Sequence, residues 1–310
     1  MRVGLVFGGD TTEGDISKLS AENIRGALQK LKYEFVNIEF DKNISTKIQD
    51  ANIDVIFNAM HGQYGEDGCL QGLLNIMQIP YTHSGVLGSA LGMNKVISNR
   101  IFKDLGINTA RGFVITKQDL HNDTWKETFK NSEIRDCKEI FVKPVCDGSS
   151  RDAFLIHNID EYSFCQTQFA TVCKQFLIEE RIIGKEIQVA VVNNEAIGML
   201  EVIPNVEKSE FYDYTAKYTN DGAVHKQVEE SEEIKNKLLT YAKNIHNALG
   251  LNCISRSEFI LTEDKKIYAL EVNTHPGLTG LSIVPEIAMK AGISYEDLVD
   301  LLLKSAKFGQ

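Results

Sequence analysis

The order of apolar runs in the first 80 residues constrains the fold more than any other feature of this 310-residue chain. Strand-like and helical runs follow one another there: RVGLVFGG, ISKLSAENIRGALQKL, YEFVNIEF and IDVIFNAMHG. Strands separated by a helix pair in parallel, because the helix carries the chain back along one face of the sheet. The sequence therefore predicts an α/β fold that begins with a parallel, Rossmann-like sheet.

Two further blocks follow this one. From Lys95 the sequence predicts a helix, a second helix near EYSFCQTQFATVC, and strands in FVIT, KEIFVKPV, DAFLIHN and QFLIEERI. From Gly184, EIQVAVV and EAIGMLEVI predict a hairpin with Asn193 and Asn194 at its turn. Residues 205–226 are polar and have no regular period, which is typical either of disorder or of a lid over a site.

Charge and composition exclude several classes of protein. The net charge of -10 provides no basic stripe, so we expect no binding to nucleic acid or to an anionic membrane, although a small anion could occupy a local basic pocket. The N-terminal apolar run is broken too early for a signal peptide and no run reaches spanning length, so we expect a cytoplasmic protein. The six cysteines form no C-x-x-C pair and are expected to be free thiols.

A glycine-rich turn, GGDTTEGDIS, follows the first strand. Residues 9–14 have the G-x-x-x-x-G spacing of a phosphate loop, but Asp15 and Ile16 follow where that loop needs Lys and Ser or Thr. Acidic side chains would repel a phosphate, whereas the next helix offers free N–H groups and a positive dipole end. An amino-acid zwitterion satisfies both features, with its ammonium on Glu13 and its carboxylate near Ser17. The alternative is that Asp15 or its neighbours only cap the helix.

A strand pair near the C-terminus, ISRSEFILTEDKKIYALEVN, gathers charge on one face. A turn centred on residues 264–265 sets Glu258 opposite Glu271 and, two residues further, Arg256 opposite Asn273. All four side chains leave the sheet on one face because strand side chains alternate. Opposed carboxylates repel unless a cation lies between them, and carboxylate and amide oxygens are ligands that Mg²⁺ accepts. The alternative is a solvent-facing hairpin, which its strongly apolar flanks disfavour.

Magnesium held by so few protein groups commonly keeps positions for substrate phosphates, which indicates a nucleotide. Lys143 lies inside the apolar run IFVKPV, where a buried ammonium needs an anionic partner. Lys95 and Lys217 could hold phosphates or be solvated. The turn CDGSSRD could fold over phosphates or be an ordinary turn, and the acids of LIEE, with Glu186, could hold adenosine or only end a strand.

Taken together, these residues resemble the D-alanine–D-alanine ligases of the ATP-grasp superfamily. The resemblance covers nearly the whole chain and rests on the order and spacing of its motifs: Gly8-Gly9 with Glu13 and Ser17, HGQYGEDG, LQG, PYTHSGVLGSALGMNK, VKP, DGSS, FYDYTAKY, Arg256, LEVN and THPGLTGLSIVP. It implies an ATP-grasp fold, α/β with α+β character in the C-terminal part. The three implied subdomains are residues 1–94, 95–183 and 184–310, with ATP between the last two and residues 205–226 as the lid.

The resemblance also implies a reaction. The carboxylate of one D-alanine attacks the γ-phosphate of ATP, and the amine of a second D-alanine then displaces phosphate from the acyl phosphate. The product is D-alanyl-D-alanine for peptidoglycan synthesis. The expected cofactors are ATP and two Mg²⁺ ions, or Mn²⁺ in their place, and the expected assembly is a homodimer.

Site residues carry over position by position. The first D-alanine would be held by Glu13, His61 and Ser17, and a network of Glu13, Ser149 and Tyr218 would close the lid. The nucleotide would be held by Lys95, Lys143, Ser150, Glu179, Glu180, Ile182, Glu186 and Lys217. Magnesium would be bound by Glu258, Glu271 and Asn273. Arg256 and the N–H of Gly277 would stabilise the oxyanion, and Ser282 would contact the carboxylate of the second D-alanine.

Four departures from the family pattern stand beside this resemblance: Gly14-Asp15-Ile16 in place of Arg-Glu-Val, Arg151-Asp152 in place of Val-Gly, Glu258 in place of Asp, and Leu281 in place of a polar residue. Losing the loop glycine is expected to hinder close approach of the backbone to phosphate. The lysines, the arginine and the metal set are complete, which favours an active ligase. Three alternatives stay open: a ligase that joins D-alanine to D-lactate or another acceptor, against which Tyr218 argues, a non-catalytic nucleotide-binding protein on the same scaffold, and an ATP-grasp ligase for other acids.

Overall fold

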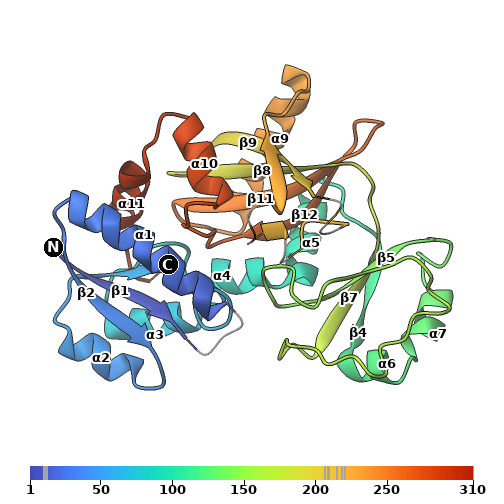
Figure 1. Cartoon of the computed structure of the whole chain (residues 1–310), viewed down its shortest axis with the longest axis horizontal. Coiled ribbons are helices and arrows are strands. Elements are labelled where there is room, and N and C mark those ends of the chain that lie inside the picture. The colour runs from blue at the N-terminus through green and yellow to red at the C-terminus, as the bar shows by residue number, and fades with distance from the viewer. Residues whose placement is uncertain are drawn as a thin grey trace.

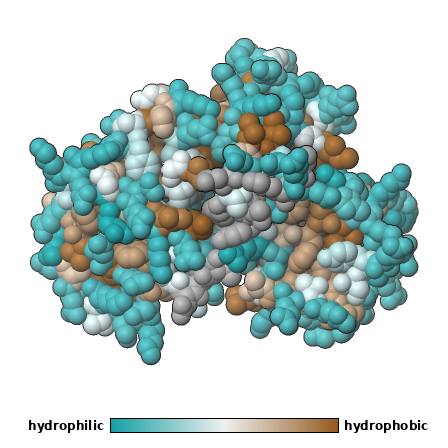
Figure 2. Space-filling model, viewed as in Figure 1, coloured by the Kyte–Doolittle hydropathy of each residue, from teal (hydrophilic) through white to brown (hydrophobic). Residues whose placement is uncertain are grey.

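The structure, a computed structural model, contains three β-sheets, each with its own helices (Figure 1). It describes residues 1–9, 13–205, 207, 210–213, 216–217, 219 and 221–309. Within these residues, none of the helices is long and apolar enough to cross a membrane. The face seen in Figure 2 is mostly hydrophilic, and its apolar residues form separate patches rather than a continuous band.

The first sheet is parallel, as predicted. Its strands β1 (Arg2–Gly8), β2 (Glu34–Phe40) and β3 (Val55–Asn58) lie in the order β2-β1-β3. The helices of this unit are α1 (Gly14–Lys30), α2 (Ile44–Asp50), α3 (Cys69–Met77) and α4 (Val86–Met93). Helix α1 begins directly after the glycine turn, so its N-terminus lies at the carboxyl end of β1, where ligands of open parallel sheets commonly bind.

The central sheet is antiparallel. Its strands β4 (Gly112–Thr116), β5 (Ile140–Pro144), β6 (Phe154–Ile156) and β7 (Gln175–Glu180) lie in the order β4-β7-β5-β6, beside the short helices α6 (Lys117–His121) and α7 (Trp125–Lys130). The helix predicted near EYSFCQTQFATVC is wrong, because residues 161–173 form turns and irregular backbone. Phe164 and Phe169 pack into the aromatic core of this unit, and the Thr171 N–H donates to Asp152 Oδ2 (2.6 Å) instead of to a helical carbonyl.

The third sheet is also antiparallel. Its strands β8 (Lys185–Val192), β9 (Glu195–Pro204), β10 (Ala223–Lys226), β11 (Ile254–Leu261) and β12 (Ile267–Asn273) lie in the order β10-β9-β8-β11-β12. The remaining helices are α5 (Lys95–Asp104), α9 (Glu232–Ala248), α10 (Ile283–Lys290) and α11 (Tyr295–Lys304).

The β8–β9 hairpin confirms the prediction from its turn residues. Asn193 and Asn194 have φ values of 52° and 61°, the conformation that a two-residue hairpin turn requires and that asparagine tolerates. The predicted lid, by contrast, is too long at its C-terminal end. Residues 223–226 form β10, which pairs with β9 because Val224 lies opposite Ile203 in the ladder. Seven residues between 205 and 223 lie outside the described part of the chain.

The strand pair β11–β12 has the predicted register at the end that matters for the site. Glu258 lies opposite Glu271, and Arg256 lies opposite Asn273. The ladder shifts between Glu258 and Phe259, so Leu270 is an extra residue on β12. The turn is centred half a residue earlier than predicted, and the bulge restores the predicted pairing of Glu258 with Glu271. Leu270 and Glu271 both line the same cavity.

The cores divide the molecule differently from the sheets. One core joins Leu5 and Ile24 of the first unit to Val192, Ile283 and Leu298 of the third. A separate core holds the central unit together and contains only residues of that unit. Helix α5, expected in the central subdomain, packs against β12. The subdomain boundaries given above therefore stay predictions, while the shared core shows that the first and third units pack as one body.

Candidate active site

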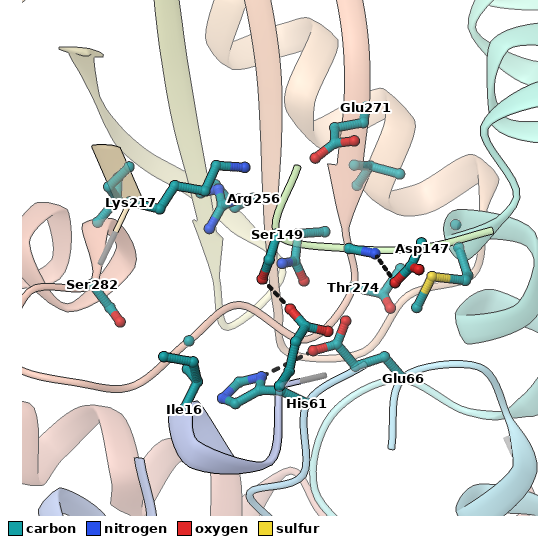
Figure 3. Close-up of a pocket in the computed structure, with 18 of the residues that line it drawn as sticks. Ile16, His61, Glu66, Asp147, Ser149, Lys217, Arg256, Glu271, Thr274 and Ser282 are labelled. Atoms are coloured by element: carbon teal, nitrogen blue, oxygen red, sulfur yellow. Dashed lines mark hydrogen bonds and ion pairs between the residues drawn. The ribbon is translucent and has the colours of Figure 1, made fainter. Parts of the chain in front are cut away.

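A cavity lies where loops from all three units meet (Figure 3). The first unit contributes Glu13 and His61, the central unit contributes the loop around Ser149, and the third unit contributes both the β11–β12 face and the loop that follows β12. Most predicted site residues come together in its wall: Glu13, His61, Lys95, Ser149, Lys217, Arg256, Glu271, Asn273, Gly277 and Ser282.

Glu13 forms the acidic end of this cavity. It precedes α1, is only 4% exposed, and accepts a hydrogen bond from the Ser149 hydroxyl. Burial raises the pKa of Glu13 to about 7, and the nearby Glu66 adds to this, whereas the bond from Ser149 opposes it. Glycine is required at position 62 because its φ is 69° and a Cβ there would lie 2.3 Å from Glu13 Oε2.

His61 is held in place on both sides of its ring. Its Nδ1 lies 2.9 Å from Glu66 Oε1 and its Nε2 lies 2.9 Å from Ser20 Oγ. Figure 3 shows His61 and Glu66 beneath Ser149, on the side of the cavity opposite Arg256 and Glu271. Sequence reasoning assigned no role to Glu66, although it lies five residues after His61 in the motif HGQYGEDG and an acid at that spacing could have indicated it.

At the opposite end of the cavity, positively charged side chains surround the carboxylate of Glu271. Burial disfavours the charged form of Glu271, but four cations hold its pKa at about 2: Lys95, Lys217, Lys143 and Arg256. Arg256 pairs with the buried carboxylate of Glu258 through Nη2. Its Nε–H is buried and has no hydrogen-bond partner among the described residues, while the residue itself lines the cavity.

The loop after β12 brings backbone and side-chain donors to the same cavity. Asn273 Oδ1 accepts the His275 N–H at 2.8 Å, which shapes the start of this loop. Gly277 faces Ser282, because a Cβ at position 277 would lie 2.9 Å from Ser282 Oγ. Ser282 directly precedes α10, and its Oγ accepts the N–H of Thr279 at 3.0 Å. The N-terminus of a helix therefore lies at this edge of the cavity.

A second, larger cavity of about 380 Å³ lies between the central and third sheets. Its wall contains most of the residues predicted to bind the nucleotide: Lys95, Lys143, Ser150, Glu179, Glu180, Ile182 and Glu186. Lys95 also lines the first cavity, and its Nζ donates to Asp147 O at 2.6 Å and lies 3.5 Å from Glu271 Oε2. The two cavities therefore meet at Lys95 and Glu271.

The carboxylates of the second cavity differ in the charged groups that lie beside them. Burial opposes the charged form of Lys143, but the adjacent Glu179 outweighs it and raises the pKa of Lys143. Burial, together with Glu258, raises the pKa of Glu186 to about 7. Glu180 points its carboxylate to Arg111, whose Nε lies 3.1 and 3.0 Å from the two oxygens. The carboxylate of Glu180 is therefore engaged by Arg111, and the backbone of Glu180 is better placed than its side chain to bind a ligand.

One predicted residue that the structure describes, Ser17, lies outside both cavity walls. Ser17 is fully buried, accepts the Gly8 N–H at 2.7 Å and donates to Ala59 O at 2.8 Å. Its hydroxyl joins the ends of β1 and β3 to α1, and it lines neither cavity. Direct substrate binding by Ser17 is therefore replaced by a structural role. Tyr218 lies outside the described residues.

The unusual Arg151-Asp152 pair lies in a tightly turned loop. Ser149, Ser150 and Asp152 have φ values of 52°, 53° and 51°, in the left-handed region. Asp152 thus occupies a backbone conformation that favours glycine but that aspartate tolerates, and its carboxylate accepts the Thr171 N–H. The Ser150 hydroxyl donates to Tyr212 O at 3.1 Å, which links this loop to the third unit. Asp152 therefore keeps the loop turned without glycine.

The predicted metal ligands fit a hard cation. Among the described residues, no group of three His, Cys, Asp or Glu side chains could hold a metal ion. The predicted set instead combines two carboxylates, Glu258 and Glu271, with the amide oxygen of Asn273, and the strand register holds all three on one face. Oxygen donors with few protein groups are the coordination that Mg²⁺ accepts beside substrate phosphates.

Comparison with solved structures identifies the fold. A structure of the D-alanine–D-alanine ligase from Bacillus anthracis matches with a TM-score of 0.82 at 31% identity, covering 98% of this chain and 97% of that one. A structure of the same enzyme complexed with ATP matches with a TM-score of 0.81 at 26% identity, covering 98% and 96%. The chain therefore has the ATP-grasp fold.

Sequence comparison gives the family. The D-ala D-ala ligase C-terminus family model matches residues 101–304, and the D-ala D-ala ligase N-terminus family model matches residues 42–84. The D-alanine–D-alanine ligase of Rickettsia akari (strain Hartford) is 41% identical over 309 residues, 99% of this chain and 92% of the relative. That of Wolbachia pipientis wMel is 39% identical, covering 98% and 94%. The chain belongs to the D-alanine–D-alanine ligase family.

Proposed function

We propose that this chain joins two D-alanines and converts ATP to ADP and phosphate, through D-alanyl phosphate, to make D-alanyl-D-alanine for peptidoglycan synthesis. One observation carries the proposal: a cavity with an acidic end at Glu13 and a cationic end at Arg256 opens, at Lys95 and Glu271, into a nucleotide-sized cavity. A zwitterion can therefore lie with its carboxylate toward the phosphates.

The first D-alanine would bind through its ammonium to Glu13. Because the pKa of Glu13 is raised to about 7 by burial, a cation placed against it lowers that pKa again, and binding releases a proton from enzymes in which Glu13 was neutral. His61, whose two ring nitrogens lie against Glu66 and Ser20, would line the acidic end of the cavity beside Glu13, and its contact with the substrate carboxylate stays a prediction from the sequence. The Ser149 hydroxyl would orient Glu13 and connect it to the central loop.

Phosphoryl transfer depends mainly on positioning and charge neutralisation. Lys143 and Lys95 line the larger cavity, and Lys217 lines the smaller one. All three are close enough to Glu271 for their positive charges to lower its pKa. Magnesium held by Glu258, Glu271 and Asn273 would neutralise phosphate charge. The adenosine would occupy the part of the larger cavity lined by Ile182 and Glu186, with the loop at Ser150 over the phosphates.

The second D-alanine would attack the acyl phosphate from the side of α10. The guanidinium of Arg256 and the N–H of Gly277 would stabilise the oxyanion, which is the interaction that acyl transfer gains in its transition state. Ser282, at the N-terminus of α10, would bind the carboxylate of this substrate. The role of Tyr218 in closing the lid, the homodimer and the cytoplasmic location remain predictions from the sequence.

The test is a panel of acceptors with purified protein, ATP and Mg²⁺, scored by ADP formation and by product mass. We expect ADP and D-alanyl-D-alanine with D-alanine alone, and no gain in ADP when D-lactate is added at neutral pH. A preferred D-alanyl-D-lactate product would assign the chain to the depsipeptide-forming class. Binding of ATP without ADP formation would favour the non-catalytic alternative.

A further inference from the structure

Two stacked histidines lie directly behind the wall of the smaller cavity. His83, in the first unit, and His275, in the loop after β12, have ring centroids 3.7 Å apart and ring planes 12° apart. They are 1% and 2% exposed. His61 meets His275 edge-on with a centroid distance of 5.5 Å. The three rings thus form one array that connects the cavity wall at His61 to the loop of residues 273–277.

The backbone at His83 is unfavourable for histidine. Its φ is 72°, in the left-handed region that glycine adopts without strain and that other residues rarely adopt. The surrounding structure holds this conformation, since the carbonyl of His83 accepts a hydrogen bond from Asn252 Nδ2 at 3.2 Å, and the same amide group donates to Ser305 O at 3.3 Å. A glycine at position 83 would satisfy the backbone better than the residue that is present.

The side chains of the pair carry a second cost. His83 Nδ1 lies 2.9 Å from Thr82 Oγ1, and the ring of His275 hydrogen-bonds the backbone of Asn58. Among the residues that the structure describes, however, neither His83 Nε2 nor His275 Nδ1 has a hydrogen-bond partner. Burying a polar nitrogen without a partner is unfavourable. The backbone strain at His83 and the desolvation of the two ring nitrogens must therefore be offset by a favourable interaction, and the stacked rings are in a position to provide it.

We infer that His83 is a positioning residue for ligation, which holds the loop of residues 273–277 in place by stacking on His275. This inference rests on the proposed function, because that loop carries Asn273 and Gly277. Besides the stack, the loop contacts the first unit through the hydrogen bond of the His275 ring to the Asn58 backbone and through a longer contact of 3.5 Å between Ser84 Oγ and Thr274 O. Without the stack, we expect the Gly277 N–H to be held less firmly beside the second D-alanine.

Three variants separate the ring from the backbone. His83→Gly removes the ring and relieves the strain, so the melting temperature should stay equal to the wild-type value or rise, while the KM for the second D-alanine rises roughly three- to tenfold and kcat falls. The KM for ATP, bound in the other cavity, should stay within about twofold. His83→Phe keeps a ring for stacking and should restore wild-type kinetics. Gln78→Gly, at an exposed residue with a φ of 58° at the end of α3, is the matched backbone control.

Amide hydrogen exchange gives a readout that does not depend on activity. In His83→Gly, peptides covering residues 273–281 should exchange faster than in the wild type, and in His83→Phe they should not. Wild-type kinetics and wild-type exchange in His83→Gly would overturn the inference, as would a loss in His83→Phe equal to that in His83→Gly. A fall in melting temperature with all kinetic constants changed in parallel would assign His83 a purely structural role. Absence of ligation in the wild type would refute the proposed function, whereas the exchange result would still decide the role of the stack.

Discussion

Replacing Glu13 by glutamine should stabilise the protein at pH 8 while removing most of its ligase activity. The pKa of Glu13 is raised from 4.5 to about 7, chiefly by burial, so the folded protein binds a proton at this site more tightly than the unfolded chain does. Glutamine keeps an oxygen that can accept the hydrogen bond from Ser149 and has no charge to desolvate. The difference in unfolding free energy between the variant and the wild type therefore measures how much the buried, ionised carboxylate destabilises the folded protein.

The sign and size follow from linkage. Below pH 4.5 the carboxyl is neutral in both states and costs nothing. Between pH 4.5 and about 7 it is ionised only in the unfolded chain, so the cost grows, and above pH 7 it is constant at roughly 3 kcal/mol. Glu13→Gln should thus unfold several degrees above the wild type at pH 8 and at nearly the same temperature at pH 4.5.

Thermal unfolding without substrates, measured at several values from pH 4.5 to pH 8, checks this expectation, and Glu22→Gln on the exposed face of α1 is the control. The kinetic expectation is a loss of roughly 100-fold in kcat/KM for D-alanine, because the substrate ammonium loses its buried partner. A stabilisation that is the same at both ends of the pH range, or a variant less stable than the wild type at pH 8, would refute the argument from burial.

Three further outcomes are expected. Chelation with EDTA should stop ADP formation and added Mg²⁺ should restore it; turnover that persists in EDTA would contradict the proposed metal ligands. Lys143→Met leaves the buried Glu179 without its cation and should destabilise the protein by about 3–5 kcal/mol, and adding Glu179→Gln should recover part of that loss in thermal unfolding. Arg256→Lys should lower kcat by roughly 100-fold, since lysine lacks the planar guanidinium with several donors, while the Kd for ATP, measured by calorimetry, changes little.

The face of the β11–β12 pair could be predicted because its signal is local. Side chains alternate along a strand, so one assumed turn places Glu258 opposite Glu271 and sets Arg256 beside them, and the structure has this register. The bulge at Leu270 could not be predicted in the same way, because the turn sequence does not show whether the turn is centred between residues 264 and 265 or on residue 264. The Asn193-Asn194 turn was equally accessible, since few residues adopt the backbone that it needs.

Contacts between distant segments could not be predicted from one sequence. Nothing near Arg111 indicates that it meets Glu180, and the contact follows only from the pairing of β4 with β7. The stack of His83 on His275 joins residues 192 positions apart, which no periodicity connects. The local pattern of residues 161–173 predicts a helix, but the segment is irregular because aromatic packing and the hydrogen bond from the Thr171 N–H to Asp152 outweigh that pattern.

The core shared by the first and third units determines which part of the enzyme can move. These two units share one core and so form one frame, whereas the described core of the central unit consists of residues of that unit. Exchange of ADP for ATP should therefore swing the central unit outward, and Lys143 and Ser149 with it. We expect Glu13, Arg256 and Gly277 to keep their relative positions, so that the binding site for the amino acids is preserved through each turnover while the nucleotide site opens and closes.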